Sequence, residues 1–201
     1  MLLLFGLNKY SKKMKDYIIS NKDEVIKRIK ENQIMALPAE SCFGLSALVN
    51  EENIQKIQSL KNRAFAKGFI LVADCLNRFE RWVDFSKLAK SDIEKLIKNY
   101  HRATTWLVPL KKEMSSLVNG QFDSIAIRIT RHAPLVEICQ KLESAIISTS
   151  ANLQGEKPAE TIDEVIHYFG YQLGGIWDQP IGIDKRPSQI ISLISGEIIR
   201  Q

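Results

Sequence analysis

Residues 60–74 read LKNRAFAKGFILVAD, and this stretch contains the alternation of helix and strand that decides the fold. Up to Lys61 the apolar residues recur at helical spacing, whereas the apolar run 69–73 has the length and composition of a buried strand. Between them the chain places Lys61, Arg63 and Lys67 within seven residues. The stretch therefore predicts a helix, a cationic turn and a buried strand in succession.

The cationic turn has three interpretations from sequence. It is a solvated surface turn, a patch for nucleic acid, or a clamp for one small anionic ligand. Lys61 and Arg63 are two positions apart, so they do not share a helix face. They converge on one ligand only if the helix ends between them and the chain turns there.

Similar helix and strand units fill the rest of the chain. Helical periodicity and helix-start signals, including capping boxes at Ser91 and Thr161, predict helices at 23–31, 50–61, 91–100, 134–142 and 161–170. Apolar and β-branched runs predict strands at 34–37, 69–73, 105–110, 124–130 and 145–147, with a final hairpin of 189–193 and 197–200. This order predicts an α/β fold with a mixed sheet and helices on its faces.

Length and charge limit the organisation of the chain. The 201 residues carry a formal charge of +5, of which +3 comes from lysines in residues 1–13, so the remainder carries only +2. That charge is too small to indicate a general nucleic-acid binder. We expect residues 1–13 to be a disordered leader or a mis-annotated start before Met14, and residues 14–201 to form one domain.

Three widely spaced cysteines, Cys42, Cys75 and Cys139, form no CxxC pair and are odd in number. They argue against a disulfide framework or a zinc site and favour a cytoplasmic protein. The histidines have no metal-ligand spacing either, so no protein-held metal is predicted. Leu2 to Phe5 form an apolar run far shorter than the roughly 20 residues that cross a bilayer, so no membrane partner is expected.

Two further loops follow predicted strands, which is where open α/β sheets bind ligands. Residues 37–45 (LPAESCFGL) contain Glu40 and Ser41, and residues 147–155 (ISTSANLQG) are rich in hydroxyl and amide groups. The second loop has the neutral donors that suit phosphate or carboxylate, although such turns are common. Neither the P-loop nor the GxGxxG nucleotide motif is present.

Taken together, these loops resemble a known family. Five motifs are similar in order and spacing to those of the YrdC/TsaC-like threonylcarbamoyl-AMP synthases, a family also described as a ribosome maturation factor. They are PAESCFGL at 38–45, Lys61-x-Arg63 followed by Lys67-Gly68, AIR at 126–128, STSAN at 148–152 and PSQI at 187–190. The resemblance extends from about residue 16 to residue 200.

The resemblance implies a YrdC-type fold, with a twisted mixed sheet around a basic cavity. It implies a nucleotidyltransferase that joins L-threonine, bicarbonate or CO2, and ATP into threonylcarbamoyl-adenylate and pyrophosphate. The product would pass to a downstream transferase complex that modifies tRNA beside the anticodon. Mg2+ would accompany ATP, held mainly through the phosphates and water.

The resemblance also implies the roles of individual residues. Lys61 and Arg63 would be catalytic, holding phosphates or the threonine carboxylate. The ATP- and threonine-binding set would comprise Lys67, Ser148, Ser150, Asn152, Arg128, Ser188, Glu40, Ser41 and Thr105.

Two departures from the family pattern bear on the function. Ala39 stands where the family has threonine, and residues 100–105 (YHRATT) replace a Trp-Pro-Gly-Pro-x-Thr segment, retaining only Thr105. The competing interpretation is a non-enzymatic, RNA-binding ribosome maturation factor that uses the same basic cavity. Weak RNA binding is accordingly an alternative partner prediction.

Overall fold

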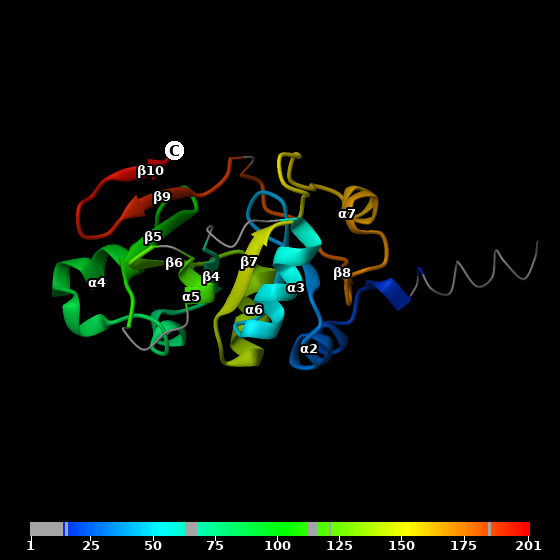
Figure 1. Ribbon diagram of the computed structural model, residues 1–201, viewed down its shortest axis with the longest axis horizontal. Helices are drawn as coiled ribbons and strands as arrows, with labels where there is room; N and C mark the ends of the chain where they lie inside the picture. The colour runs from blue at the N-terminus through cyan, green and yellow to red at the C-terminus, as the bar shows by residue number, and fades with distance from the viewer. Residues whose placement is uncertain (1–13, 15, 63–67, 112–115, 121, 185) are drawn as a thin grey trace, which may run out of the picture.

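Ten strands form one mixed sheet, and helices pack on both of its faces (Figure 1). The computed structural model describes residues 14, 16–62, 68–111, 116–120, 122–184 and 186–201. Across the sheet the order is β1-β8-β2-β3-β7-β4-β6-β5-β9-β10, which runs from right to left in Figure 1. Within the described part of the chain, no helix is long and apolar enough to cross a membrane.

The elements alternate along most of the chain. The strands are β1 (Ile18–Ile19), β2 (Met35–Pro38), β3 (Phe43–Leu48), β4 (Ile70–Ala73), β5 (Thr104–Pro109), β6 (Ser124–Ile129), β7 (Ile146–Ser150), β8 (Gly175–Trp177), β9 (Gln189–Ser192) and β10 (Ile198–Arg200). The α-helices are α2 (Lys22–Lys30), α3 (Glu51–Lys61), α4 (Lys90–Ile97), α5 (Ser116–Asn119), α6 (Ala133–Leu142) and α7 (Ile162–Phe169). Two short 3-10 helices, η1 (Leu76–Phe79) and η2 (Phe85–Lys87), lie between β4 and α4.

Side chains of successive strand residues point to opposite faces, and this alternation divides the interior into two cores. In β4, Leu71 belongs to the core beneath α3 and α7, whereas Val72 belongs to the core beneath α2 and α6. In β7, Ile147 and Ile146 divide in the same way. The central strands are therefore apolar on both faces, which explains their continuous hydrophobic runs.

Helix α3 ends where the sequence predicted, at Lys61. Its C-cap residue, Asn62, has a left-handed backbone with φ of 48°, and its N–H bonds back to the carbonyls of Gln58 and Ser59. At the other end, the Asn50 side chain accepts a hydrogen bond from the N–H of Asn53. The chain therefore turns directly after Lys61, as convergence with Arg63 would require.

Most of the predicted elements are confirmed, including the capping box at Thr161 and the final hairpin. The capping box at Ser91 is wrong: α4 begins at Lys90, and the Asp92 carboxylate accepts from the N–H of Ala89 instead. That helix also ends at Ile97 and does not reach Tyr100. An acidic residue two positions after Lys90 provides this alternative cap.

The two ligand loops are shorter than predicted. Phe43–Leu48 is strand β3, which pairs with β2, and strand β7 continues through Ser150. Polar residues 148–150 are in the sheet because they pair with residues of β3. The predicted leader, 1–13, and the cations Arg63 and Lys67 lie outside the described residues.

Because β4 is packed in the hydrophobic core, shortening one of its buried side chains should strongly destabilise the fold. Leu71 is fully buried in β4, so Leu71→Ala should lower the free energy of unfolding by about 2–5 kcal/mol. Ile194→Ala is the control, since Ile194 is 63% exposed and should change stability by less than about 0.5 kcal/mol. Urea denaturation measures both, and equal values for the two variants would contradict the assignment of β4 to the core.

Candidate active site

A large cavity, with a volume of about 1040 Å³, opens on the face of the sheet that α2 and α6 partly cover. Strand alternation decides which side chains line it. In β6, Ile125 and Ile127 face the opposite core, so Ser124, Ala126 and Arg128 face the cavity. The sequence SIAIRIT thus encodes one apolar face and one small or cationic face.

Small residues of β3 and β7 make room for a ligand beside this strand. Ser148 is paired with Ser46 in β3 and with Ile70 in β4, and its side chain lies in the cavity wall. Gly44 approaches so closely that a Cβ there would lie 3.0 Å from Ser148 Oγ. A larger residue at position 44 would therefore crowd Ser148.

Lys61 is buried at the end of α3 and joins that helix to the end of β7. Its ammonium group donates to the backbone carbonyls of Ser150 and Asn152, the second at 2.8 Å, and to Asn152 Oδ1 at 2.9 Å. Ser150 Oγ donates to the same amide oxygen at 2.7 Å. The lysine therefore fixes the conformation of the segment 150–152 at the cavity edge.

Glu40 and Arg128 form a largely buried ion pair across the cavity. Arg128 Nη2 lies 3.2 Å from Glu40 Oε2, and Thr130 Oγ1 donates to Glu40 Oε1 at 2.7 Å. Burial is the largest influence on the pKa of Glu40 and by itself raises it. The charge of Arg128, the Thr130 hydrogen bond, a backbone hydrogen bond and the charge of His132 oppose burial, and the pKa of Glu40 is lowered, so the carboxylate stays ionised.

A second arginine reaches the cavity from the last strand. Arg200 donates to the carbonyl oxygen of Ser188 at 2.7 Å and to Ser188 Oγ at 3.0 Å. Thr105 Oγ1 lies 3.0 Å from that same hydroxyl. Arg102 holds the neighbouring residue through its bonds to the carbonyl of Pro187. The segment 187–188 is therefore held by side chains from three directions.

Burial lowers the pKa of Arg200, and the charges of Arg128 and Arg102 lower it further. This mutual repulsion identifies a region of concentrated positive charge. A bound polyanion would relieve it, because each guanidinium offers several N–H donors to phosphate or carboxylate oxygens.

The structure brings most of the predicted site residues together. The cavity is lined by Glu40, Ser41, Lys61, Arg128, Ser148, Ser150, Asn152 and Ser188. Thr105 lies one layer behind, in contact with Ser188. Arg63 and Lys67 were predicted here but fall outside the described residues.

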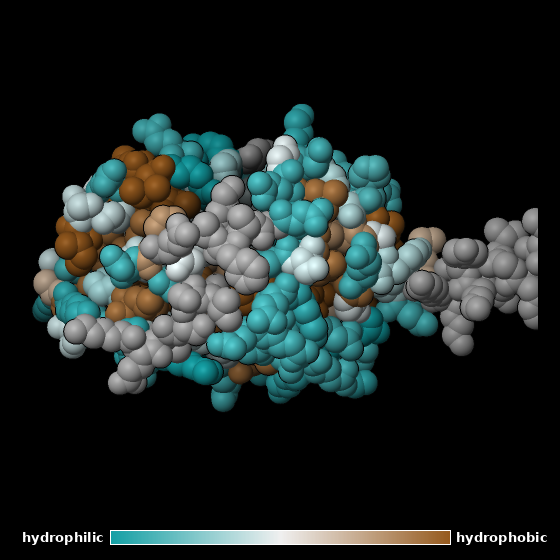
Figure 2. Space-filling model, viewed as in Figure 1, coloured by the Kyte–Doolittle hydropathy of each residue, from teal (hydrophilic) through white to brown (hydrophobic). Residues whose placement is uncertain are grey.

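Arg200 is the site residue that the sequence interpretation missed. The segment 197–200 was read as one strand of a hairpin, and nothing local marks its last arginine as different from a surface cation. Pairing of β9 with β5 brings the hairpin to the cavity. The apolar side chains of the same hairpin, Ile194, Ile198 and Ile199, are exposed, and Figure 2 shows hydrophobic surface at this end of the molecule.

Cys42 lines the cavity but is not suited to nucleophilic catalysis. Burial raises the pKa of its thiol, and the hydrogen bond from Ser41 only partly opposes this. The thiolate is the reactive form, so the thiol is inert near neutral pH. Within the described ranges, no three histidine, cysteine or acidic residues are grouped as metal ligands. A divalent cation here would depend on ligand oxygens and water.

The Sua5/YciO/YrdC family model, described as "telomere recombination", matches residues 27–201. The chain belongs to this family. A curated relative named threonylcarbamoyl-AMP synthase, from Pasteurella multocida, is 37% identical over 182 residues, covering 90% of this chain and 99% of the relative. A protein of the same name from Haemophilus influenzae is 38% identical over the same length.

Solved structures share the fold at lower identity. P. abyssi Sua5 complexed with L-threonine has a TM-score of 0.77 at 22% identity, covering 87% of this chain and 51% of that one. E. coli YciO has a TM-score of 0.74 at 16% identity, covering 89% and 87%. The predicted YrdC-type α/β fold is therefore confirmed.

The buried ion pair leads to a pH-dependent prediction. Glu40→Gln keeps the side-chain volume but leaves Arg128 without its anionic partner, which should destabilise the fold by about 3 kcal/mol at pH 7. Because folding lowers the pKa of Glu40, its stabilising effect is present above the unfolded value, about 4.5, and is lost as the pH falls through the lower folded value.

Denaturant unfolding of wild type and Glu40→Gln between pH 7 and pH 3 measures this effect. The difference in unfolding free energy should shrink as the pH falls below about 4.5, where Glu40 of the unfolded chain takes up a proton, and should be lost once the pH has passed the lower folded value. A difference that does not vary with pH would show that the carboxylate charge contributes nothing.

Lys61 leads to a second stability prediction. Lys61→Met retains the apolar stem and removes the hydrogen bonds to residues 150 and 152, so the unfolding free energy should fall by about 1–3 kcal/mol. Lys56→Met is the matched control on the same helix, because Lys56 is more exposed and its pair with Glu52 is worth at most about 1 kcal/mol. Equal melting temperatures for the two variants would contradict the bracing role of Lys61.

Proposed function

We propose that this protein is a threonylcarbamoyl-AMP synthase, which converts L-threonine, bicarbonate or CO2, and ATP into threonylcarbamoyl-adenylate and pyrophosphate. One observation carries the proposal: two arginines, a lysine-braced polar segment and small hydroxyl side chains converge in one cavity. Its volume, about 1040 Å³, is at the upper end of small-molecule sites, as two bound substrates require. Relatives of this name match along nearly their whole length.

The reaction requires alignment and charge stabilisation more than a side-chain nucleophile. The threonine amine bonds to the carbon of CO2 and releases a proton, giving a carbamate. A carbamate oxygen then attacks the α-phosphorus of ATP, the α–β P–O bond breaks, and pyrophosphate leaves. Negative charge accumulates on the phosphate oxygens in this step, so cationic donors held in advance lower the barrier.

Each part of the cavity has a role in this scheme. Arg128, held by Glu40, binds the threonine carboxylate or the carbamate, and Ser148 adds a hydrogen bond. Arg200 and the segment 150–152, braced by Lys61, bind the ATP phosphates. Ser188 links the two regions because Arg200 and Thr105 both contact it. Glu40 therefore acts through Arg128 and is a positioning residue.

Arg63 and Lys67 complete the phosphate site in this proposal. In the described structure Lys61, two residues before Arg63, ends α3 and lines the cavity. Mg2+ enters bound to ATP as part of the substrate, held by phosphate oxygens and water, with Ser150 in the cavity wall.

The amino-acid subsite differs from the family pattern at Ala39. That residue is buried, and its backbone bonds to Cys42 and Gly182, so position 39 offers no hydroxyl. Ser41 lines the cavity two residues later and supplies the hydroxyl nearest in sequence. In this proposal Ser41 or a water takes the place of the family threonine.

The product is a mixed anhydride, which is prone to hydrolysis. A downstream transferase that places the threonylcarbamoyl group on tRNA adenosine would consume it. The proposal therefore includes such a transferase as partner and a cytoplasmic location, where ATP and tRNA are both present. The alternative of a non-enzymatic RNA-binding factor gains no support from the relatives, whose names state an enzymatic activity.

A direct assay tests the proposal. The purified protein is incubated with ATP, Mg2+, bicarbonate and threonine, and both pyrophosphate and the adenylate are measured. Pyrophosphate release should require threonine and bicarbonate together. Release that is independent of threonine, or none at all from a folded protein, would refute the synthase.

Arg128 provides the sharpest test of a single residue. Arg128→Ala should lower kcat/KM for threonine by about 100-fold or more, because a buried cation that faces the substrate is lost. Arg81→Ala is the matched control, since Arg81 is exposed and does not line the cavity. If both variants retain wild-type kcat/KM, Arg128 has no part in substrate binding.

A further inference from the structure

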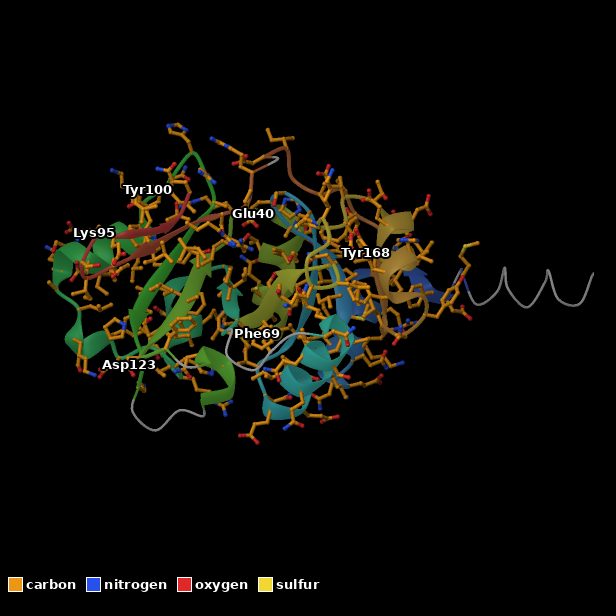
Figure 3. All side chains as sticks on the ribbon, turned by 45° about the horizontal axis from the view of Figure 1, so that its top comes forward. Glu40, Phe69, Lys95, Tyr100, Asp123 and Tyr168 are labelled. Carbon is orange, nitrogen blue, oxygen red and sulfur yellow. The ribbon has the colours of Figure 1, made fainter. Side chains whose placement is uncertain are left out.

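A second, smaller cavity of about 310 Å³ adjoins the first. It lies between the end of α4, the start of β5, the turn from β6 to α6, and residues 182–184. Of the described lining residues, only Glu40 lines both cavities. Figure 3 places Tyr100 between Lys95 of α4 and Glu40, on the same side of the molecule. The proposed reaction leaves this second cavity without a role.

The charges around the second cavity favour an anion. Lys98, Arg102 and Arg131 contribute cationic side chains to its lining. The structure gives Arg131 one hydrogen bond, a long one of 3.4 Å to the carbonyl of Ile97. Lys98 Nζ lies 5.8 Å from the centre of the Tyr100 ring. Arg131 and Lys98 therefore remain available to phosphate or carboxylate oxygens, whereas Arg102 already donates to the carbonyl of Pro187.

The acidic residues in the lining are already paired. Glu40 is bound to Arg128, on the side of the large cavity. Asp184 accepts from the Arg186 side chain at 3.1 Å. Asp184 also interacts with the charge of Arg102, so the excess of positive charge in the lining comes from Lys98 and Arg131.

One wall of the cavity is apolar, which a simple inorganic anion would not need. Tyr100 packs against Trp106, with ring centres 5.8 Å apart, and lines the cavity. Ile183 and Ile97 also line it, although they are 99% and 51% exposed. Exposed apolar side chains beside a cationic rim indicate a ligand with a flat or apolar part as well as a charge.

His132 adds a buried hydrogen-bonding atom to this lining. Burial lowers the pKa of His132, so the ring is neutral, and it donates a hydrogen bond to the backbone carbonyl of Pro180. Nε2 is buried and has no hydrogen-bond partner among the described residues. As the unprotonated nitrogen of a neutral ring, Nε2 accepts a hydrogen bond. A matching ligand therefore offers a donor, such as a hydroxyl or an amine.

The geometry points to a second binding site, for a nucleoside monophosphate, in the cavity formed by Tyr100, Arg131, His132 and Ile183. The phosphate lies against Arg131 and Lys98, and Arg102 adds positive charge to the same lining. The base packs against Tyr100 and Ile183, since aromatic and apolar side chains stack on the faces of bases. A ribose hydroxyl or base amine donates to His132 Nε2. Glu40 lines this site and is paired with Arg128, so a ligand bound here affects the position of Arg128 in the large cavity.

Photolabelling with 8-azido-AMP, followed by mass-spectrometric mapping, tests the location. Label should appear in the peptide that contains residues 98–104, and unlabelled AMP should prevent it. Because the readout is position, it does not depend on catalysis in the large cavity. Label confined to residues of the large cavity would overturn the proposal.

Calorimetric titration with AMP tests the contacts. Arg131→Glu should weaken binding at this site by about tenfold or more, because a charge-assisted contact becomes a repulsion. Ile183→Asp, at a 99% exposed position, should also weaken it without affecting the fold. Lys141→Glu, the same charge reversal at an exposed position of α6, is the control and should leave the affinity within about twofold.

Competitors distinguish the sources of the nucleotide. Displacement of the label by AMP supports a free mononucleotide, whereas displacement only by a 5′-phosphorylated oligoadenylate supports a nucleotide within RNA. Inorganic phosphate that competes as well as AMP would overturn the proposal, since the apolar wall would then contribute nothing. Unchanged affinity in Arg131→Glu would overturn it as well.

Discussion

The two-residue alternation of side chains along the central strands constrains the whole molecule. Strands β4, β6 and β7 each present apolar residues to the core beneath α3 and α7. On the other face, β4 and β7 contribute both to the core beneath α2 and α6 and to the large cavity, whereas β6 contributes only to the cavity. Each of these strands packs into a core with one face and lines the cavity with the other. Because Ile127 anchors β6 in the core, the neighbouring Arg128 is held rigidly toward the ligand space.

Buried ion pairs and hydrogen bonds hold the polar side chains that the strands direct into the cavity. Burying an ionic group is costly unless it is paired or hydrogen-bonded, and Glu40, Arg128 and Lys61 each have such a partner. Glu40 holds Arg128, and Thr130 holds Glu40. Lys61 braces the end of β7 through carbonyl oxygens. These contacts join segments far apart in sequence, so the cavity has its shape before a ligand arrives, as electrostatic catalysis requires.

Glu40 also makes the two cavities neighbours. Its carboxylate holds an arginine of the large cavity, and its side chain forms part of the lining of the smaller one. The segment after β8 closes this region, since Gly182 donates to the carbonyl of Ala39, and a Cβ at Gly182 would lie 2.4 Å from the carbonyl oxygen of Glu40. A change at this one loop would therefore reach both cavities.

The sequence alone determined the α/β class, the order of the longer elements and several residues that line the large cavity, but not the short strands β1 and β8. Local signals do this: apolar runs mark strands, Asn50 and Thr161 start helices, and the motifs at 61 and 148–152 indicate the family. Tertiary structure decided what depends on pairing between distant segments. Strand pairing shows that 148–150 are in the sheet and brings Arg200 to the cavity, and the packing of side chains brings Glu40 to Arg128. Gly44 and Ser150, which pair in the sheet, are 150 − 44 = 106 residues apart, and no local pattern encodes such contacts.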